Sequence, residues 1–214
     1  EAVESGKKQF VGYELPGRTL GVIGLGAIGG GVANSAVALG MNVIGFDPAI
    51  TINHAWNLSR QVERVTDIDE IFARADVVTV HVPLTDATRG LVNAERLAMM
   101  KPHATVLNFA RGGIVDDEAI VEALNSGRIG AYVCDFPSNA LKANPRVTAL
   151  PHLGASTGEA EDNCAIMAAT ELRDFLENGN ITNSVNFPEA TLHAREDGES
   201  RICVASDKAP DRIA

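Results

Sequence analysis

The chain has 214 residues, of which 45% are hydrophobic, and its formal net charge is −10 at pH 7. This length predicts one large domain, or one and a half, with ample apolar material for a core. The negative charge argues against nucleic acid or an anionic membrane as a partner, and no apolar run approaches the roughly 20 residues that a membrane span needs.

The N-terminus and the cysteines bear on where the protein works. The first residues are polar, so no secretory signal is expected, and the missing initiator Met predicts a fragment or a processed product. Cys134, Cys164 and Cys203 are sparse and are not spaced for zinc, so no metal site is expected. We interpret them as small buried apolar residues of a protein in the reducing cytoplasm.

The first elements along the chain form a strand–helix–strand unit. Residues 1–18 are polar with Gly and Pro and are interpreted as a lead-in or hinge. Short apolar runs over 19–23 and 42–46 predict strands, and the residues between them predict a helix over 28–39. The helical spacing places four apolar residues on one face, namely Ile28, Val32, Ala36 and Leu39.

The turn into that helix carries the pattern G-x-G-x-x-G at Gly24, Gly26 and Gly29, and Asp47 ends the second apolar run. Gly24 permits the tight turn, Gly26 lets a pyrophosphate approach the backbone, and Gly29 lets the helix pack close to the strand. The helix start offers unpaired N–H groups to phosphates. Asp47 can accept hydrogen bonds from ribose hydroxyls and would repel the extra phosphate of NADP. The unit therefore predicts a dinucleotide site that prefers NAD.

Strands and helices continue to alternate, which predicts an α/β fold: a doubly wound, mostly parallel (Rossmann) sheet covered on both faces. Ligands are expected beyond the carboxyl ends of the strands. The sequence predicts strands over 76–81, 105–108, 129–134 and 146–149, and helices over 67–73, 93–100, 116–126 and 156–178.

Two polar side chains directly follow later strands. Arg111 lies after the 105–108 strand, in a loop that two following glycines make flexible. Its guanidinium can bind a substrate carboxylate with two parallel hydrogen bonds. His152 follows the 146–149 strand, and an imidazole suits proton transfer at cellular pH. A surface arginine in a turn and a structural histidine are the simpler interpretations. The other histidines are interpreted as structural or surface residues, with His81 at a strand end the least certain.

These motifs together resemble the D-isomer-specific 2-hydroxyacid dehydrogenases, and among them the phosphoglycerate dehydrogenases. The similarity covers about residues 5–188. It is carried by Gly24–Gly29, His81–Thr85 with Thr88, Asn108–Asp116, Pro151–Thr157 and Asn183–Pro188.

The resemblance implies an NAD-dependent oxidation of a D-2-hydroxy acid, with 3-phosphoglycerate as the expected substrate and a homo-oligomer as the expected assembly. It implies that Arg111 holds the carboxylate of a 2-hydroxy or 2-oxo acid and that His152 moves the hydroxyl proton. The implied cofactor contacts are Ala27 and Ile28 at the pyrophosphate, Asp47 at the ribose, Pro83 and Thr88 at the adenosine half, Phe109, Ala110 and Arg111 at the nicotinamide side, Asp135 at the nicotinamide amide, and His152 beside them.

One position departs from the family pattern. The family has a Glu that pairs with the catalytic His, whereas here Asn139 occupies that position and Asp135 is displaced by one residue. An Asn can orient an imidazole but cannot stabilise its charge, and a one-residue shift on a strand reverses the direction of a side chain. Either Asn139 pairs with His152 or another carboxylate takes the role.

The predicted organisation has five parts. Residues 1–18 lead into a Rossmann domain over 19–154, followed by the long helix and return segment over 155–188. The Glu-, Asp-, Gly- and Ala-rich stretch 189–200 is interpreted as a linker, and 201–214 as the start of a truncated ACT-like regulatory domain. In the resembling family the substrate domain is built mainly from residues that precede the Rossmann unit, so this piece alone is expected to bind NAD and turn over slowly or not at all.

Two other functions stay open. One is a dehydrogenase of another 2-hydroxy acid, such as glycerate, lactate or glyoxylate. The other is an NAD-responsive binding protein like the C-terminal-binding corepressors, which share the fold. Arg111 and His152 do not separate that class from the enzymes, and the ACT-like tail weighs against it.

Overall fold

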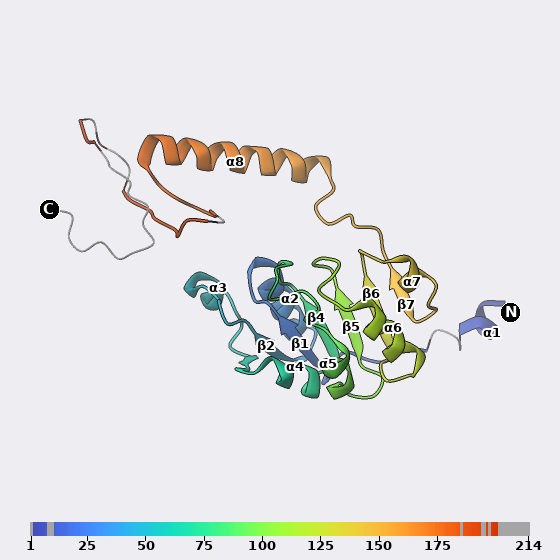
Figure 1. Cartoon of the computed structure of the whole chain (residues 1–214). Coiled ribbons are helices and arrows are strands. Elements are labelled where there is room, and N and C mark those ends of the chain that lie inside the picture. The colour runs from blue at the N-terminus through green and yellow to red at the C-terminus, as the bar shows by residue number, and fades with distance from the viewer. Residues whose placement is uncertain (1, 8–10, 185, 194–195, 197, 201–214) are drawn as a thin grey trace. The chain divides into compact units, whose positions relative to one another are not determined.

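The computed structural model describes the chain except for residues 1, 8–10, 185, 194–195, 197 and 201–214. It divides into two compact units, Glu1–His152 and Leu153–Ala214 (Figure 1). The segment expected to begin an ACT-like domain, 201–214, lies outside the described residues. Among the described helices, none has both the length and the apolar character that crossing a membrane requires.

The described part of the first unit contains one sheet of parallel strands in the spatial order β3-β2-β1-β4-β5-β6-β7 (Figure 1). The predicted parallel sheet is therefore confirmed. The strands are β1 (Thr19–Ile23), β2 (Asn42–Phe46), β3 (Val62–Arg64), β4 (Val77–Val80), β5 (Thr105–Asn108), β6 (Ala131–Cys134) and β7 (Val147–Ala149).

Most helices begin where a polar residue caps them. The Asp116 side chain accepts hydrogen bonds from two backbone N–H groups at the start of α6, and Asp67 and Asn93 cap α4 and α5 in the same way. Three short helices, α1, α3 and α7, were not predicted. The helices are α1 (Ala2–Gly6), α2 (Ala27–Ala38), α3 (Ile52–Trp56), α4 (Ile68–Arg74), α5 (Ala94–Met99), α6 (Asp117–Asn125), α7 (Asn139–Lys142) and α8 (Gly158–Asn178).

Helices cover both faces of the sheet, as the doubly wound fold requires. Successive strand residues point to opposite faces. In β4, Val77 joins a hydrophobic cluster with Ala33 and Ala36 of α2. Its neighbour Val78 joins a second cluster, with Phe72 of α4. The second cluster also receives buried side chains from α5 and α6.

The strand order places a switch point between β1 and β4. From β1 the chain builds outward through β2 and β3 on one side, then returns to place β4 on the other side of β1. The connections that follow β1 and β4 therefore diverge, which leaves a crevice beyond their carboxyl ends. This crevice is the place where doubly wound folds bind their ligands.

The predicted apolar face of α2 is right at two of its four positions. Ala36 is buried and Val32 is partly buried against the same cluster, whereas Ile28 and Leu39 are 73% and 57% exposed. The reason is the short distance between helix and sheet: a Cβ on Gly29 would lie 1.9 Å from the Gly24 carbonyl oxygen. Only a residue without a side chain fits at this contact, so the large apolar side chain of the neighbouring Ile28 lies away from the sheet.

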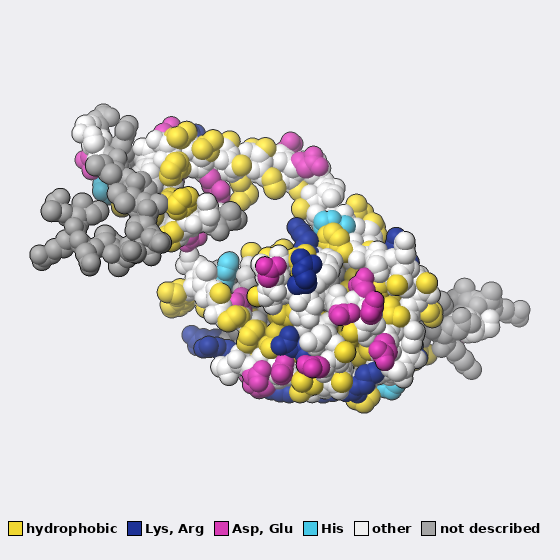
Figure 2. Space-filling model, viewed as in Figure 1, with side chains coloured by type: hydrophobic (Ala, Val, Ile, Leu, Met, Phe, Trp, Pro, Cys, Tyr) yellow, Lys and Arg dark blue, Asp and Glu magenta, His cyan; other side chains and the backbone are white. Residues whose placement is uncertain are grey.

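The second unit consists mainly of α8 and the segment that returns beside it. Thr157 caps the start of α8, and Gly179 ends it with φ of +74°. The α8 surface carries exposed hydrophobic side chains (Figure 2). Cys164 is exposed on α8, so its predicted burial is wrong, whereas Cys134 is buried as predicted and Cys203 lies outside the described residues.

Candidate active site

The loop between β1 and α2 has the geometry of a phosphate cradle. Gly24 has φ of +89°, and a Cβ there would lie 2.6 Å from the His81 carbonyl oxygen. Gly26 is the N-cap of α2 and provides no side-chain cap, so the first N–H groups of the helix have no partner from it. A Cβ on Gly26 would meet nothing within 4 Å. The loop therefore packs tightly against the protein at Gly24, whereas at Gly26 it leaves open space for a ligand.

The Asp47 carboxylate faces this loop. Its Oδ2 atom accepts a hydrogen bond of 2.8 Å from the Leu25 N–H, and its Oδ1 atom accepts one of 2.9 Å from the Ala49 N–H. Each carboxylate oxygen can accept more than one hydrogen bond, so both retain capacity for hydroxyl donors. The acid after β2 is thus fixed beside the glycine turn.

A hollow of about 520 Å³ lies at the carboxyl edge, lined by residues that follow β4 and β5 and by one residue of α2. Several predicted cofactor contacts meet there. The lining residues are Ile28, His81, Val82, Pro83, Leu84, Phe109, Ala110 and Arg111.

Thr88 does not line this hollow, although the resemblance gave it a cofactor contact. Its hydroxyl donates to the Pro83 carbonyl at 2.6 Å and accepts from the Thr85 N–H at 2.8 Å. These bonds close the 83–88 loop on itself. In this arrangement Thr88 acts by shaping the loop that presents Pro83.

Asn108 holds the loop that carries Arg111. It ends β5, and its side chain is 1% exposed. Its amide oxygen accepts from the Ala110 N–H at 3.1 Å, and its amide nitrogen donates to the Arg111 carbonyl at 2.9 Å. One buried side chain therefore satisfies two backbone groups of the 109–111 turn and fixes where Arg111 leaves the sheet.

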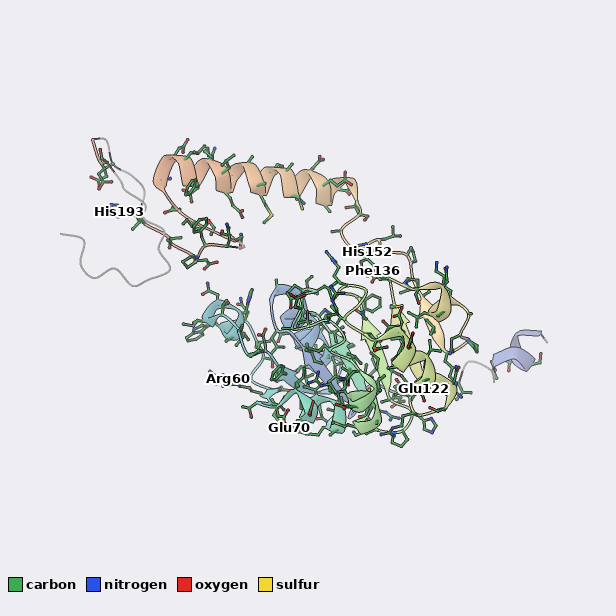
Figure 3. All side chains as sticks on the ribbon, in the orientation of Figure 1. Arg60, Glu70, Glu122, Phe136, His152 and His193 are labelled. Carbon is green, nitrogen blue, oxygen red and sulfur yellow. The ribbon has the colours of Figure 1, made fainter. Side chains whose placement is uncertain are left out.

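Arg111 and His152 both contact the ring of Phe136, which follows β6. The Arg111 Cζ atom lies 5.7 Å from the ring centroid. The centroids of the Phe136 and His152 rings are 4.4 Å apart, with 42° between their planes. Figure 3 shows the two labelled rings together. The structure thus brings the two predicted catalytic residues to one aromatic side chain, although they are 41 positions apart in the printed sequence.

Asn139 does not pair with His152. It is exposed in the first turn of α7, where Ser138 is the N-cap. Within the described ranges, no hydrogen bond or ion pair joins His152 to either Asn139 or a carboxylate. The Oδ1 atom of Asp135 is buried and has no hydrogen-bond partner among the described residues.

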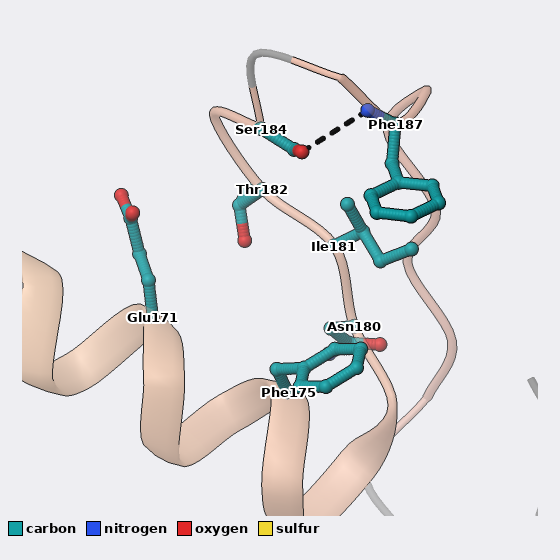
Figure 4. A pocket seen from close by; sticks show the side chains of 7 residues that line it. All are labelled: Glu171, Phe175, Asn180, Ile181, Thr182, Ser184 and Phe187. Atoms are coloured by element: carbon teal, nitrogen blue, oxygen red, sulfur yellow. Dashed lines mark hydrogen bonds between the residues drawn. The ribbon is translucent and has the colours of Figure 1, made fainter.

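A second hollow, of about 350 Å³, lies within the second unit (Figure 4). None of the predicted site residues line it, and we assign no part of the chemistry to it. Its walls come from α8 and the segment that follows, and consist of Glu171, Phe175, Asn180, Ile181, Thr182, Ser184 and Phe187.

Comparison with known families identifies the first unit. The model of the D-isomer specific 2-hydroxyacid dehydrogenase, NAD binding domain, matches residues 1–154. The chain belongs to this family. It is 44% identical over 188 residues to D-3-phosphoglycerate dehydrogenase of Methanocaldococcus jannaschii, which covers 85% of this chain and 36% of that protein. It is 38% identical over 191 residues to the human protein of the same name, covering 86% and 35%.

Solved structures of the dehydrogenase family have the same fold. A glyoxylate reductase from Paecilomyes thermophila matches with a TM-score of 0.74 and 30% identity, covering 86% of this chain and 58% of that one. An NAD-complexed D-isomer specific 2-hydroxyacid dehydrogenase from Lactobacillus delbrueckii matches with a TM-score of 0.71 and 27% identity, covering 83% and 58%. The chain spans about a third of the length of the curated relatives it matches.

The residues present fit NAD, the cofactor of this family domain. The open space at Gly26 and the uncapped start of α2 suit a diphosphate. The fixed carboxylate of Asp47 suits ribose hydroxyls. The buried, unpartnered Oδ1 atom of Asp135 offers an acceptor to an amide donor such as a carboxamide. The predicted cofactor is thus confirmed at the level of the family, while the individual contacts stay predictions.

Sequence reasoning missed three contributors to the dehydrogenase site. His81 lines the hollow, its Nε2 atom lies 3.0 Å from the Thr79 hydroxyl, and burial lowers the pKa of its imidazole. Asn108 was singled out only as the first residue of the Asn108–Asp116 motif, and Phe136 was not singled out. A polar residue ending an otherwise apolar strand could have drawn attention to Asn108, but no local signal marks Phe136.

Replacing Asn108 with Ala is expected to lower the free energy of unfolding by about 1–3 kcal/mol, because the part-buried Ala110 N–H and Arg111 C=O lose the hydrogen bonds of a buried side chain. Denaturation in urea, followed by far-UV circular dichroism, measures this loss.

Asn34 is a matched control. It also bonds two backbone groups of one loop, the Asn57 carbonyl at 2.7 Å and the Ser59 N–H at 2.8 Å, but at a more exposed position. The Asn108→Ala loss should exceed the Asn34→Ala loss. Equal losses would contradict the role given to the buried clamp.

Proposed function

We propose that this chain is the NAD-binding part of an enzyme that oxidises the 2-hydroxyl of a D-2-hydroxy acid, with 3-phosphoglycerate as the substrate. The observation that carries the proposal is the convergence of Arg111 and His152 on Phe136, with Arg111 also lining the cofactor-edge hollow. The phosphoglycerate assignment is supported by relatives at 38–44% identity that bear the name D-3-phosphoglycerate dehydrogenase.

In the proposed mechanism, Arg111 binds the substrate carboxylate. Its guanidinium is exposed, and Nη1 is anchored by a 2.8 Å hydrogen bond to the Ala110 carbonyl, so the remaining N–H groups can reach a planar anion. The Asn108 clamp fixes the backbone from which this side chain extends. Binding through two parallel hydrogen bonds orients the neighbouring hydroxyl-bearing carbon.

His152 acts as the acid–base group of the reaction. An imidazole takes the hydroxyl proton as the C–H bond breaks and returns it in the reverse direction. NAD, when bound, accepts the hydride. The proton and the hydride leave the same substrate, so a 2-hydroxy acid becomes a 2-oxo acid with the electrons balanced.

Asp47 is proposed to select NAD over NADP. A carboxylate accepts hydrogen bonds from the ribose hydroxyls and repels a phosphate on the same ribose. The 2.8 Å hydrogen bond from the Leu25 N–H holds the Asp47 carboxylate next to the glycine turn. The carboxylate therefore keeps a fixed position relative to the proposed ribose site.

The parts of the proposal beyond this unit rest on resemblance alone. We propose that residues 201–214 begin an ACT-like domain, that the enzyme is a homo-oligomer, and that it works in the cytoplasm. Dehydrogenation of another 2-hydroxy acid is the second candidate, favoured by the likeness to a glyoxylate reductase.

Asp47→Asn should weaken NADH binding and reduce the preference for NADH over NADPH, because the amide keeps an acceptor but loses the charge that repels phosphate. Titration of the chain with each nucleotide, followed by fluorescence, measures both affinities. Asp162→Asn, which makes the same charge change on α8, should bind both nucleotides like the unaltered chain. An unchanged ratio in Asp47→Asn would refute the selection.

The substrate assignment is tested on the complete gene product with NAD and a panel of 3-phosphoglycerate, glycerate, lactate and glyoxylate. We expect the highest kcat/KM with 3-phosphoglycerate, and a roughly 10- to 100-fold loss in Arg111→Ala because charged hydrogen bonds to the carboxylate disappear. A higher kcat/KM with another acid would replace the substrate. NADH binding without turnover of any acid would favour the corepressor-like alternative.

A further inference from the structure

The ring of Phe136 is the feature that the two proposed catalytic side chains share. It lies 4.4 Å from the His152 ring, centroid to centroid, and 5.7 Å from the Arg111 Cζ atom. Phe109, a second aromatic residue near the site, lines the hollow instead. Phe136 therefore stands where the loop after β5 and the segment after β7 meet.

The surroundings of Phe136 fix its position. It follows β6, whose last residue Cys134 is buried. Its Cβ atom would lie 3.6 Å from a Cβ built on Gly112, so it packs against the turn that carries Arg111. Ser138, two residues later, caps α7. Both sides of Phe136 are thus anchored to secondary structure.

His152 has no polar support in the described part of the chain. It is exposed, and neither a hydrogen bond nor an ion pair holds its imidazole there. An acid–base group must nevertheless be held in a productive direction, since a small misplacement of reacting groups lowers the rate strongly. The tilted contact with Phe136 is the interaction that can supply this orientation.

Arg111 contacts the same ring with its guanidinium, which is attracted to an aromatic face. The carboxylate and the hydroxyl of a 2-hydroxy acid are on adjacent carbons, so the groups that bind them must sit at a set separation. A rigid ring in contact with both groups provides that separation.

We propose that Phe136 is a positioning residue that sets the relative placement of Arg111 and His152 for one 2-hydroxy acid. The proposal rests on the proposed function, because it assigns Arg111 and His152 to the same substrate. It explains how this chain orients His152 with neither Asn139 nor a carboxylate paired to it. Phe136 itself does not touch the reacting atoms in this role.

The contact is tested first on the chain itself, without activity. The imidazole protons of His152, assigned by their loss in His152→Gln, should carry a ring-current shift in the NMR spectrum. Phe136→Leu should move these signals toward the values of an exposed histidine, and Phe136→Tyr, which keeps the ring, should retain the shift. Signals that do not move in Phe136→Leu would overturn the proposal.

Catalysis is tested on the complete gene product. Phe136→Leu should lower kcat roughly 10- to 100-fold while the NADH dissociation constant stays unchanged, and Phe136→Tyr should restore kcat. The unchanged NADH affinity shows that the variant is folded. A kcat within about twofold of the unaltered enzyme would overturn the positioning role.

The two failures can be told apart. If the unaltered enzyme binds NADH but oxidises no 2-hydroxy acid, the proposed function fails, whatever Phe136 does. If the unaltered enzyme is active and Phe136→Leu is equally active, only the positioning role fails. If Phe136→Leu loses NADH binding, the Phe136→Met variant replaces it, and the same roughly 10- to 100-fold loss of kcat at unchanged NADH affinity is then required.

Discussion

The close approach of α2 to the end of β1 is the constraint on which the rest of the site depends. Gly29 must lack a side chain because its Cβ would lie 1.9 Å from the Gly24 carbonyl oxygen, and Gly24 needs its positive φ to make the turn. With α2 docked in this way, its uncapped N-terminus and the open space at Gly26 face the crevice between β1 and β4. Asp47, one strand over, is then bonded to the same turn.

Parallel strands bring the remaining chemistry to that edge. The segments after β4, β5, β6 and β7 all leave the same side of the sheet, so residues distant in sequence become neighbours. The chain holds them by different interactions. Asn108 clamps a turn through backbone hydrogen bonds, whereas Phe136 contacts Arg111 and His152 through its ring. The site therefore combines a cofactor cradle built by one loop with catalytic groups drawn from several.

The sequence was sufficient for the features that depend on local patterns. The glycine turn, the strand over 105–108, the helix over 116–126 and the parallel sheet were predicted from residue types at fixed spacing and are present. On α2, Ala36 and Val32 face the core as predicted but Ile28 and Leu39 do not, because apolar periodicity does not reveal how closely the start of a helix approaches its sheet.

Features that arise between loops could not be predicted. The position of Phe136 relative to Arg111 and His152 depends on where the neighbouring strands β5, β6 and β7 end in the sheet. The sequence of one segment alone does not determine this register. The short helix α7, beginning at Asn139, carries that residue away from the pairing that alignment to the family motif suggested. Thr88 was assigned a ligand contact, although its hydroxyl is engaged in its own loop. Local folding, within the loop of Thr88 and at the start of α7, decides where these two side chains lie.

The most direct measurement of the central claim is NADH binding by Gly26→Val, compared with Gly31→Val. A Cβ meets nothing within 4 Å at either position, and both residues belong to the start of α2, so neither change should unfold the chain. The account predicts that Gly26→Val loses NADH binding because the side chain fills the cradle, while Gly31→Val retains it. Equal NADH affinity in the two variants would contradict a diphosphate site at this turn.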